Sequence, residues 1–550
     1  MFRARWVVLS IITLVLIAYG SFTWVNALLD SIFAYRSPLH AAPPMPGAPL
    51  GQPMASRVVL VIVDALRDDT SRQPDVMPFL NQLRLQGAWA TMHSQPPSFS
   101  QPAWTTIATG AWPEINDAAP INVDTAEVLP WTQDSIFAVA KRAGYKTAVS
   151  GHEWWGRFIL PGLRDAGFFT AGEDDAADRD VVNAAMPWLV GGGYQLVLIH
   201  LDQVDYAGHS QGGPRDPRWN AAAMRADGLL KQIAGALDYD RDSLFVVSDH
   251  GQIDRGGHGG QDPITLVEPF VMAGPGVRPG QYPDIQQVDV APTIAVLLGT
   301  NLPATGEGKP LTQMLNVETS RQAQIAAAWN VQQDAVASAY ERSIDVVRQS
   351  SITDATAYAR IVAARDARDW NELWPRRIVF ASVVALIGAG VLIWKRSRGV
   401  AMLFLGAILY ALAYNLVFAV ITGNVYSLST VPSTGATGLA IEVAMFTLIA
   451  TVLAWLAAMV LSGALRRGAL HAAQATYGFA LITLYLLSLP VLLGFAVDGA
   501  TTTWRLPNFL LAFLHFTNLM QAMLVAVLGI VLSGVAAFIG WRMKATHPTP

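Results

Sequence analysis

The chain has 550 residues, more than one hydrophobic core usually supports, so we expect two or more domains. Hydrophobic residues make up 52% of it and charged residues only 14%, against roughly 25% charged in an average soluble domain, which indicates a large membrane-embedded part. The net charge of −4 argues against nucleic-acid binding, and the lack of cysteine leaves histidine, carboxylates and hydroxyls to build any metal or catalytic site.

The first predicted element is a membrane helix. The apolar run from Trp6 to about Val25 is long enough to cross a bilayer, which takes about 20 residues. Arg3 and Arg5 precede it as in a signal sequence, but no clear small-x-small cleavage site follows, so we expect a retained signal anchor within residues 1–30. Residues 31–56 are rich in Pro and Gly, which predicts a linker.

Residues 57–315 have the pattern of a soluble α/β domain. Short apolar runs rich in Val, Ile and Leu alternate with longer amphipathic stretches; examples are Val58–Val63, Leu196–Leu201 and Leu244–Val247. Continuous apolar strands separated by helices predict a mainly parallel sheet that is covered on both faces. The expected fold class is therefore α/β with a doubly wound, mainly parallel sheet.

The last part of the chain is predicted to return to the membrane. From Glu318 to Trp370 it lacks Pro and Gly and has helical spacing, so we expect residues 316–375 to form a helical stalk. Residues 376–550 contain five more apolar spans, which predict an all-α transmembrane domain. These spans are Ile378–Trp394, Ala401–Ile421, Leu439–Leu461, Tyr477–Val497 and roughly Leu510–Ile539.

Basic residues are distributed unevenly around the spans, and this predicts the orientation of the chain. With six crossings, the basic residues near both termini and in two loops fall on one side, whereas loops on the other side, such as residues 423–435, are nearly uncharged. The positive-inside rule makes the basic side cytoplasmic. We expect a multi-pass plasma-membrane protein with both termini in the cytoplasm and residues 57–315 outside it. The sequence contains no Asn-x-Ser/Thr sequon, so nothing in it indicates an endoplasmic reticulum lumen.

Acidic residues follow three of the predicted strands. Asp64 comes directly after the first strand, Asp205 shortly after the second and Asp249 at the end of the third. In an open parallel sheet, ligands bind at the carboxyl ends of the strands, so these side chains are expected to converge. One such Asp is about as often a helix N-cap or turn former, but three of them interleaved with histidine favour a site.

Three histidines share this pattern. His209 lies one helical turn after Asp205, His250 follows Asp249 directly, and His258 stands in the Gly-rich segment Gly256–Gly260. Carboxylate and neutral imidazole are ligands that suit zinc, and glycines allow the backbone to approach closely. A lone histidine would more often be an ordinary surface or core residue, but the shared pattern favours a metal site.

Ser100 is the candidate nucleophile. It follows a Pro-rich turn and precedes a stretch that can be helical, where a hydroxyl meets the anion-favouring field of a helix N-terminus. Local sequence alone slightly favours the simpler interpretation, in which Ser98 or Ser100 only caps that helix.

Seven short segments of the chain carry a family resemblance. They are Val58–Arg67, Met77–Leu80, Ser100–Gly110, Gly151–Trp154, Asp205–His209, Ser248–Gly251 and His258–Gly260. They resemble the type I phosphodiesterase/nucleotide pyrophosphatase branch of the alkaline-phosphatase superfamily, and within it the glycosylphosphatidylinositol ethanolamine-phosphate transferases. The layout is also similar, with an N-terminal anchor, an external catalytic domain and a C-terminal helical bundle.

The resemblance implies an alkaline-phosphatase-like site for two divalent metal ions, with zinc as the expected element. The implied ligands are Asp205, His209 and His258 for one ion, and Asp64, Asp249 and His250 for the other. Ser100 would be the nucleophilic ligand of the second ion. Its alkoxide would attack phosphorus and form a phosphoserine, which water or an acceptor hydroxyl then releases.

Two departures from the family pattern bear on this expectation. The family usually has Thr where Ser100 stands, which is chemically tolerable. It has Asn or Arg, which helps to hold the phosphate, where this chain has Ala103. Either another donor replaces it, such as Arg67, His152 or a backbone amide, or phosphate binding is weakened. The same segment lacks the Arg of the sulfatase motif, which disfavours a sulfatase.

The expected function is a membrane-anchored, metal-dependent phosphodiesterase or phosphotransferase that acts outside the cytoplasm on lipid-linked or glycolipid phosphodiester head groups. Hydrolase and transferase share the covalent intermediate, so the sequence does not separate them. The alternative is a transport or scaffold role for the helical bundle, with a regulatory or inactive outer domain. Its candidates are the intramembrane residues Glu442, His515 and Gln521, although Glu442 is more simply explained by snorkelling from a helix end.

Overall fold

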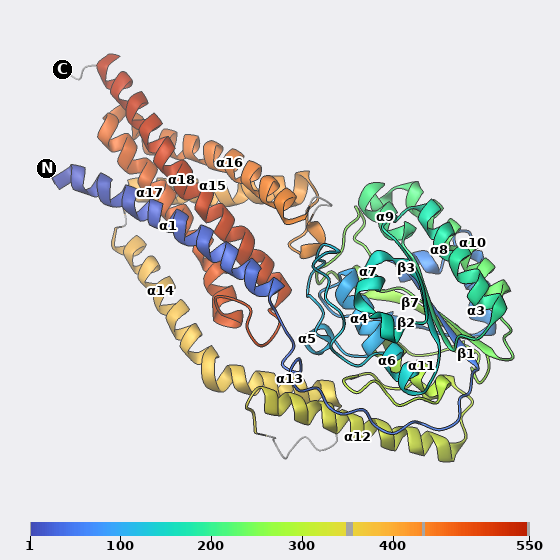
Figure 1. The fold of residues 1–550 in the computed structure, drawn as a ribbon. Coiled ribbons are helices and arrows are strands. Elements are labelled where there is room, and N and C mark those ends of the chain that lie inside the picture. The colour runs from blue at the N-terminus through green and yellow to red at the C-terminus, as the bar shows by residue number, and fades with distance from the viewer. Residues whose placement is uncertain (1, 348–355, 396, 432–434, 547–550) are drawn as a thin grey trace. The chain divides into compact units, whose positions relative to one another are not determined.

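The chain is folded into two compact units in a computed structural model that describes residues 2–347, 356–395, 397–431 and 435–546 (Figure 1). The first, here called the helical unit, comprises Met1–Ser31, Trp370–Thr502 and Pro507–Pro550. The second, here called the sheet unit, comprises Ile32–Asp369 and Thr503–Leu506. Each is described separately below.

A nine-stranded sheet forms the centre of the sheet unit, in the order β4-β3-β5-β1-β6-β7-β2-β8, with β9 beside β2. The strands from β4 to β6 are parallel, whereas β7 is antiparallel to both of its neighbours. The predicted α/β class with a mainly parallel sheet is therefore confirmed. The strands are β1 Arg57–Val63, β2 Ala88–His93, β3 Thr147–His152, β4 Ala166–Thr170, β5 Leu196–Leu201, β6 Asp242–Val247, β7 Val267–Ala273, β8 Gly280–Gln281 and β9 Ile285–Gln286.

The central strand β1 is a continuous apolar run because both faces of the sheet are buried. Alternate side chains of a strand point to opposite faces. Val58, Leu60 and Ile62 enter a core with helices α4, α6 and α11, whereas the residues between them enter a second core with α3, α8 and α10. The sheet is thus covered on both sides. These helices are α3 Pro78–Gln86, α4 Ser100–Thr109, α6 Ile136–Arg142, α8 Asp175–Gly191, α10 Pro217–Gly235 and α11 Val290–Leu298.

Two long helices follow the sheet in sequence, in the stretch where a stalk was expected. They are α12 Thr319–Ser343 and α13 Ala357–Arg368, and both belong to the sheet unit. With Leu39 and Ile115 they form a third, smaller apolar cluster. The short helices of this unit are α2 Asp68–Ser71, α5 Pro113–Asn116, α7 Glu153–Phe158 and α9 Gln203–Ser210.

The helical unit contains six helices that are long and apolar enough to cross a membrane, judged by length and composition among the described residues. Each coincides with one of the six predicted spans, which supports a multi-pass membrane protein. The last span lies within one continuous helix. The helices are α1 Phe2–Phe33, α14 Trp374–Trp394, α15 Arg398–Asn415, α16 Gly435–Ser462, α17 Ala469–Asp498 and α18 Phe509–Thr546, and α15 continues as a π-helical stretch, Leu416–Ile421.

Candidate metal centre

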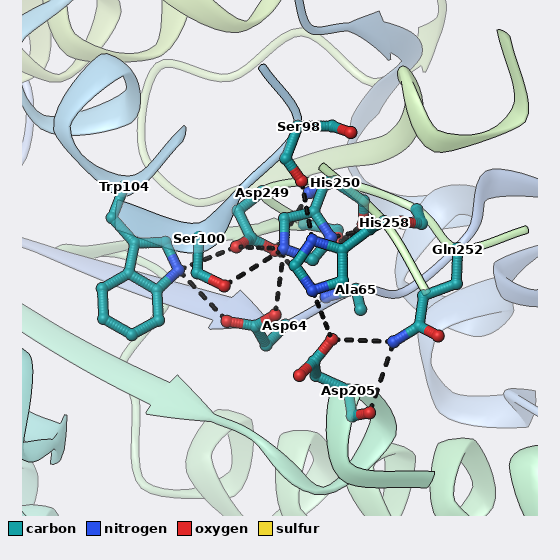
Figure 2. Close-up of polar contacts among 12 residues, drawn as sticks. Asp64, Ala65, Ser98, Ser100, Trp104, Asp205, Asp249, His250, Gln252 and His258 are labelled. Atoms are coloured by element: carbon teal, nitrogen blue, oxygen red, sulfur yellow. Dashed lines mark hydrogen bonds and ion pairs between the residues drawn. The ribbon is translucent and has the colours of Figure 1, made fainter. Parts of the chain in front are cut away.

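The three strands that precede the predicted carboxylates are neighbours in the sheet. β1 pairs in parallel with β5 on one side and with β6 on the other, so their carboxyl ends lie next to one another. Asp64 follows β1 directly, Asp205 lies in α9 just after β5, and Asp249 is the second residue after β6. The convergence expected from the sequence is therefore present, and Figure 2 shows these side chains pointing toward one another.

One group of predicted ligands gathers at α9. Asp205 and His209 share a helix face because they are four residues apart, and the closest approach of their polar side-chain atoms is 3.5 Å. His258 Nε2 lies 3.4 Å from Asp205 Oδ1 and 2.8 Å from His209 Nε2. His258 Nδ1 is 2.8 Å from the Ser98 carbonyl, which favours a proton on Nδ1 and leaves the Nε2 lone pair facing the other ligands.

The loop that carries His258 needs glycine in order to lie so close to α9. Gly256, Gly257 and Gly259 all have positive φ, a region that favours glycine. A Cβ on Gly256 would also collide with the backbone carbonyl of Gly208 in α9. The Gly-rich segment thus places an imidazole from a distant part of the sequence against Asp205 and His209.

A second group gathers around His250, which is fully buried. Its Nε2 lies 3.3 Å from Asp249 Oδ2, 3.5 Å from Asp64 Oδ1 and 3.3 Å from the Ser100 hydroxyl. His250 Nδ1 is 3.2 Å from the Gly251 carbonyl, which favours the tautomer whose Nε2 is a lone pair. Asp64 Oδ1 is buried and has no hydrogen-bond partner among the described residues. The His250 lone pair and the nearest oxygens of Asp64 and Asp249 therefore face one another, and the Ser100 hydroxyl lies beside them as a proton donor.

The electrostatics of the site show what such an arrangement costs without a cation. Burial, reinforced by the neighbouring carboxylates, raises the pKa of Asp64 well above its ordinary value, and burial also raises the pKa of Asp249. Burial opposes ionisation of Asp205 too, but the imidazoles of His209, His258 and His250 outweigh it and lower the pKa of this carboxyl. A divalent cation would remove the repulsion and match the carboxylate and imidazole donors. Three groups that could hold a metal ion are found among the described residues: Asp205, His250 and His258; Asp64, Asp249 and His250; and Asp64, His200 and Asp202.

Ser100 is the first residue of α4 and is 5% exposed. The helix has Phe99 at its N-cap position and no side-chain cap, so the interpretation that Ser98 or Ser100 merely caps it does not describe the structure. The Ser98 hydroxyl instead donates to the Gly260 carbonyl and accepts from the Gly259 amide, which fixes the loop that carries His258. The Ser100 hydroxyl is left facing His250 at the uncapped N-terminus of α4.

Three side chains that the sequence did not single out as site residues support the ligands. The Trp104 Nε1–H donates to Asp249 Oδ2 at 2.8 Å and to Asp64 Oδ2 at 3.1 Å, and His200 Nε2 lies 2.9 Å from Asp64 Oδ2. The Gln252 amide donates to Asp205 Oδ1 at 2.7 Å. Two of them had a signal in the sequence: Trp104 lies one turn after Ser100, and His200 is the only polar residue of its strand.

The two side chains suggested as substitutes at the Ala103 position differ in their surroundings. The Arg67 guanidinium is already paired with Asp69 and with Asp254, the latter at 2.8 Å. His152 ends β3, and its Nδ1 accepts the Trp154 amide at 3.3 Å. Burial lowers the pKa of His152 to about 4, so the ring is neutral near pH 7 and its Nε2 carries a proton that can be donated.

Comparison with known proteins gives matches over the sheet unit. Residues 58–270 match the family model described as Type I phosphodiesterase / nucleotide pyrophosphatase. GPI ethanolamine phosphate transferase 3, catalytic subunit, of Mus musculus is 27% identical over 308 residues, which are 50% of this chain and 28% of that protein. GPI ethanolamine phosphate transferase 2, catalytic subunit, of Homo sapiens is 27% identical over 295 residues, 48% of this chain and 29% of that protein. The chain thus spans less than a third of the length of these relatives.

Among solved structures, human ectonucleotide pyrophosphatase / phosphodiesterase 5 matches with a TM-score of 0.41 and 15% identity, over 48% of this chain and 100% of that one. The resemblance predicted from the motifs, to type I phosphodiesterases and to GPI ethanolamine phosphate transferases, is confirmed by the family model and the sequence relatives.

Proposed function

We propose that this protein is a metal-dependent phosphotransferase that moves a phosphoethanolamine-type group between membrane lipids through a phosphoserine at Ser100. The observation that carries the proposal is the position of the Ser100 hydroxyl, 3.3 Å from His250 within a cluster of three carboxylates and three imidazoles. The match to a phosphodiesterase family model and the names of the relatives support the reaction class and the group transferred.

The donor set fits two divalent ions, for which zinc is the expected element. The ligands proposed for one ion are Asp205, His209 and His258, and those for the other are Asp64, Asp249 and His250. Three carboxylates against two divalent cations leave a net positive site, which suits an alkoxide and a phosphodiester anion. Metals bound there would lower the pKa of the Ser100 hydroxyl and stabilise the charge of the leaving oxygen.

The residues of the chain position the groups that react. Ser100 Oγ attacks phosphorus, the bond between phosphorus and the leaving oxygen breaks, and the leaving group departs with that electron pair. An acceptor hydroxyl then attacks the phosphoserine and regenerates Ser100. Trp104 and His200 hold the carboxylates of Asp64 and Asp249 in place through these two steps. We propose that the neutral ring of His152 supplies the phosphate hydrogen bond that the family obtains at the Ala103 position.

The membrane sets where the reaction takes place. Six candidate spans tether the sheet unit to a bilayer, which suits a substrate whose phosphodiester is attached to a lipid. The charge distribution supports cytoplasmic termini and a sheet unit on the external side of a plasma membrane. Lipid-linked or glycolipid head groups are therefore the proposed donor and acceptor.

The first test of this proposal is phosphodiester cleavage by the purified full-length protein. With zinc it should hydrolyse bis-(p-nitrophenyl) phosphate faster than p-nitrophenyl phosphate or p-nitrophenyl sulfate. Ser100→Ala should lower this turnover by a factor of at least about 10³ while elemental analysis shows that the metal content is retained. Full activity of Ser100→Ala would exclude Ser100 as the nucleophile.

The matched control is Ser243→Ala, which removes a buried hydroxyl at the opposite end of β6 and should keep full turnover. A wild-type protein that binds no metal and cleaves no diester would contradict the proposal as a whole. Transfer is separated from hydrolysis by lipid extraction: cells that lack the protein should lose a phosphoethanolamine-modified lipid, and the Ser100→Ala variant should fail to restore it.

A further inference from the structure

A cluster of polar and aromatic side chains in the helical unit takes no part in the proposed chemistry. It lies where α15 ends and α16 begins, and its polar members are Tyr414, Asn424 and Glu442. We call these three residues the acceptor cluster. Glu442 is the residue for which the sequence favours simple snorkelling. In the structure it is partly buried, and the Asn424 amide donates to its carboxylate at 3.3 Å.

The backbone around the acceptor cluster departs from a regular helix. α15 ends in the π-helical stretch Leu416–Ile421, a form that is rare and is often found at functional sites. The chain then folds back, and the backbone N–H of Asn424 donates to the backbone carbonyl of Phe418 at 3.1 Å. The Phe418 ring lies 5.7 Å from the Tyr414 ring and 4.9 Å from the Tyr426 ring. The rings of Tyr414, Phe418 and Tyr426 are therefore packed on one another at this end of the bundle.

Two members of the acceptor cluster have oxygen atoms without a partner. Tyr414 is 3% and Asn424 is 4% exposed, and neither Tyr414 Oη nor Asn424 Oδ1 has a hydrogen-bond partner among the described residues. Tyr414 and Asn424 are connected through Phe418, whose ring packs on Tyr414 and whose carbonyl accepts the Asn424 backbone N–H. Buried polar atoms without partners are costly, most of all at membrane depth. The Tyr414 phenol oxygen and the Asn424 amide oxygen are thus acceptors that no described residue uses, and the Glu442 carboxylate lies beside Asn424.

We propose that the acceptor cluster binds the primary ammonium of an ethanolamine-type lipid head group. A primary ammonium has three N–H donors, one for each member of the cluster. Glu442 supplies the charge that complements an ammonium group. A phosphate would be repelled by Glu442, and a bare divalent cation would demand more oxygen ligands than one carboxylate and two neutral groups.

The order of the spans places this cluster on a useful side of the membrane. Asn424 follows the third candidate span, Arg398–Ile421, whereas the sheet unit follows the first. Successive crossings alternate sides, so both lie on the same side whatever the orientation of the chain. The cluster would hold the head group of a donor lipid on the side where the metal centre works. This role rests on the proposed function, but the binding itself requires no turnover.

The test uses full-length protein in nanodiscs of phosphatidylcholine that contain phosphatidylethanolamine or its N,N-dimethyl analogue. Lipids that remain bound after detergent exchange are quantified by mass spectrometry. The wild type should prefer phosphatidylethanolamine over phosphatidylcholine by at least about tenfold, as expected for a single hydrogen bond to a charged group, with the dimethyl lipid between them. Glu442→Gln and Tyr414→Phe should reduce this ratio to near one. An unchanged ratio in both variants would overturn the proposal.

The control removes a phenol hydroxyl at another position in the helical unit. The Tyr477 phenol accepts from Ser533 at 2.9 Å, and Tyr477→Phe should keep the lipid preference. Loss of preference in Tyr477→Phe as well would count against the cluster. Thermal unfolding of Glu442→Gln in the same nanodiscs should match that of the wild type, which shows that the variant is folded. If it does not match, Tyr414→Phe carries the test. Lipid preference without turnover in the wild type would refute the proposed function and leave this inference standing.

Discussion

At the scale of single residues, the candidate metal centre buries carboxyl groups at a cost in stability. Asp64 and Asp249 are both buried, and one oxygen of Asp64 has no hydrogen-bond partner among the described residues. Burial raises the pKa of both carboxyls, and the neighbouring Asp249 raises that of Asp64 further. A divalent cation bound to these groups would offset this cost.

This strain predicts that Asp64→Asn stabilises the metal-free protein. An asparagine oxygen can still accept from His200 and Trp104, and its NH₂ group would face the His250 lone pair. The melting temperature should rise by about 1–2 °C, the effect of about 1 kcal/mol in a unit as large as this one, whereas zinc affinity should fall.

The measurement is thermal unfolding of the full-length protein with a chelator and with zinc. The exposed Asp75→Asn serves as the control and should change neither state. A lower melting temperature for metal-free Asp64→Asn would show that the Asp64 carboxylate is stabilising as it stands.

Trp104 illustrates a second residue-scale effect, in which a neighbour orients the ligands. Trp104→Phe removes the N–H that bridges Asp64 and Asp249 and keeps an aromatic ring stacked on Trp155. Groups that orient metal ligands typically contribute 10–100-fold to affinity, so zinc binding by competitive chelator titration should weaken by about that factor.

The control for this prediction is Trp219→Phe, which removes an indole donor to Thr70 on the other face of the sheet. It should leave zinc affinity unchanged. Equal affinities of the Trp104→Phe variant and the wild type would show that the bridging hydrogen bonds are dispensable.

At the scale of elements, the site depends on how strand ends and helix starts are held together. α9 begins where Asp178 of α8 accepts the backbone N–H groups of Asp202 and Gln203. The far end of α4 is held by Glu307, whose carboxylate accepts the Trp112 amide at 2.8 Å. Both carboxyls are buried, so the connections that position Asp205 and Ser100 are polar bonds inside the core.

Glu307 makes the connection at α4 sensitive to pH. Burial raises its pKa from the ordinary 4.5 to about 8, so the folded state keeps a proton that the unfolded chain releases between these values. The stability contributed by the protonated form is therefore complete below about pH 4.5 and is lost as the pH rises through about 8.

The prediction is that Glu307→Gln flattens the pH profile of stability between about pH 5 and 8. One proton gives a slope of at most about 1.4 kcal/mol per pH unit, and this slope should be missing from denaturation curves of the variant. Glu127→Gln, the same change at an exposed site, should keep the wild-type slope. Identical slopes for Glu307→Gln and the wild type would mean that Glu307 is ionised in the folded protein.

At the largest scale, the side of the membrane on which each part of the chain lies follows from the six candidate spans. The sheet unit lies between the first two of them in sequence. Because the chain has no cysteine, single cysteines can report the side on which a residue lies. We predict that Gln73→Cys in the sheet unit reacts with a membrane-impermeant maleimide in intact cells. Ser397→Cys, between the second and third spans, should react only after the membrane is permeabilised.

The opposite labelling pattern would reverse the proposed orientation without affecting the proposed chemistry. Both positions are exposed, so the accessibility of the side chains in the fold does not limit the reaction.

Much of the architecture is recognisable in the amino-acid sequence. Membrane spans and buried parallel strands are recognisable locally, because each requires a run of apolar residues of a characteristic length. The predicted ligands could be grouped because carboxylates and histidines directly follow such strands. The resemblance to phosphodiesterases rests on the same short segments, and Ala103 marked where that resemblance departs from the family.

The contacts between side chains distant in sequence follow only from the packing of the elements. The order β5-β1-β6 brings three strand ends together, and no local pattern reveals that order. The structure also shows that Ser98 holds a loop rather than capping α4. Trp104 and His200 support the ligands. The acceptor cluster likewise depends on a helix end folding back on itself. Local periodicity encodes which residues are buried, whereas hydrogen-bonding partners distant in sequence are fixed only when the elements pack.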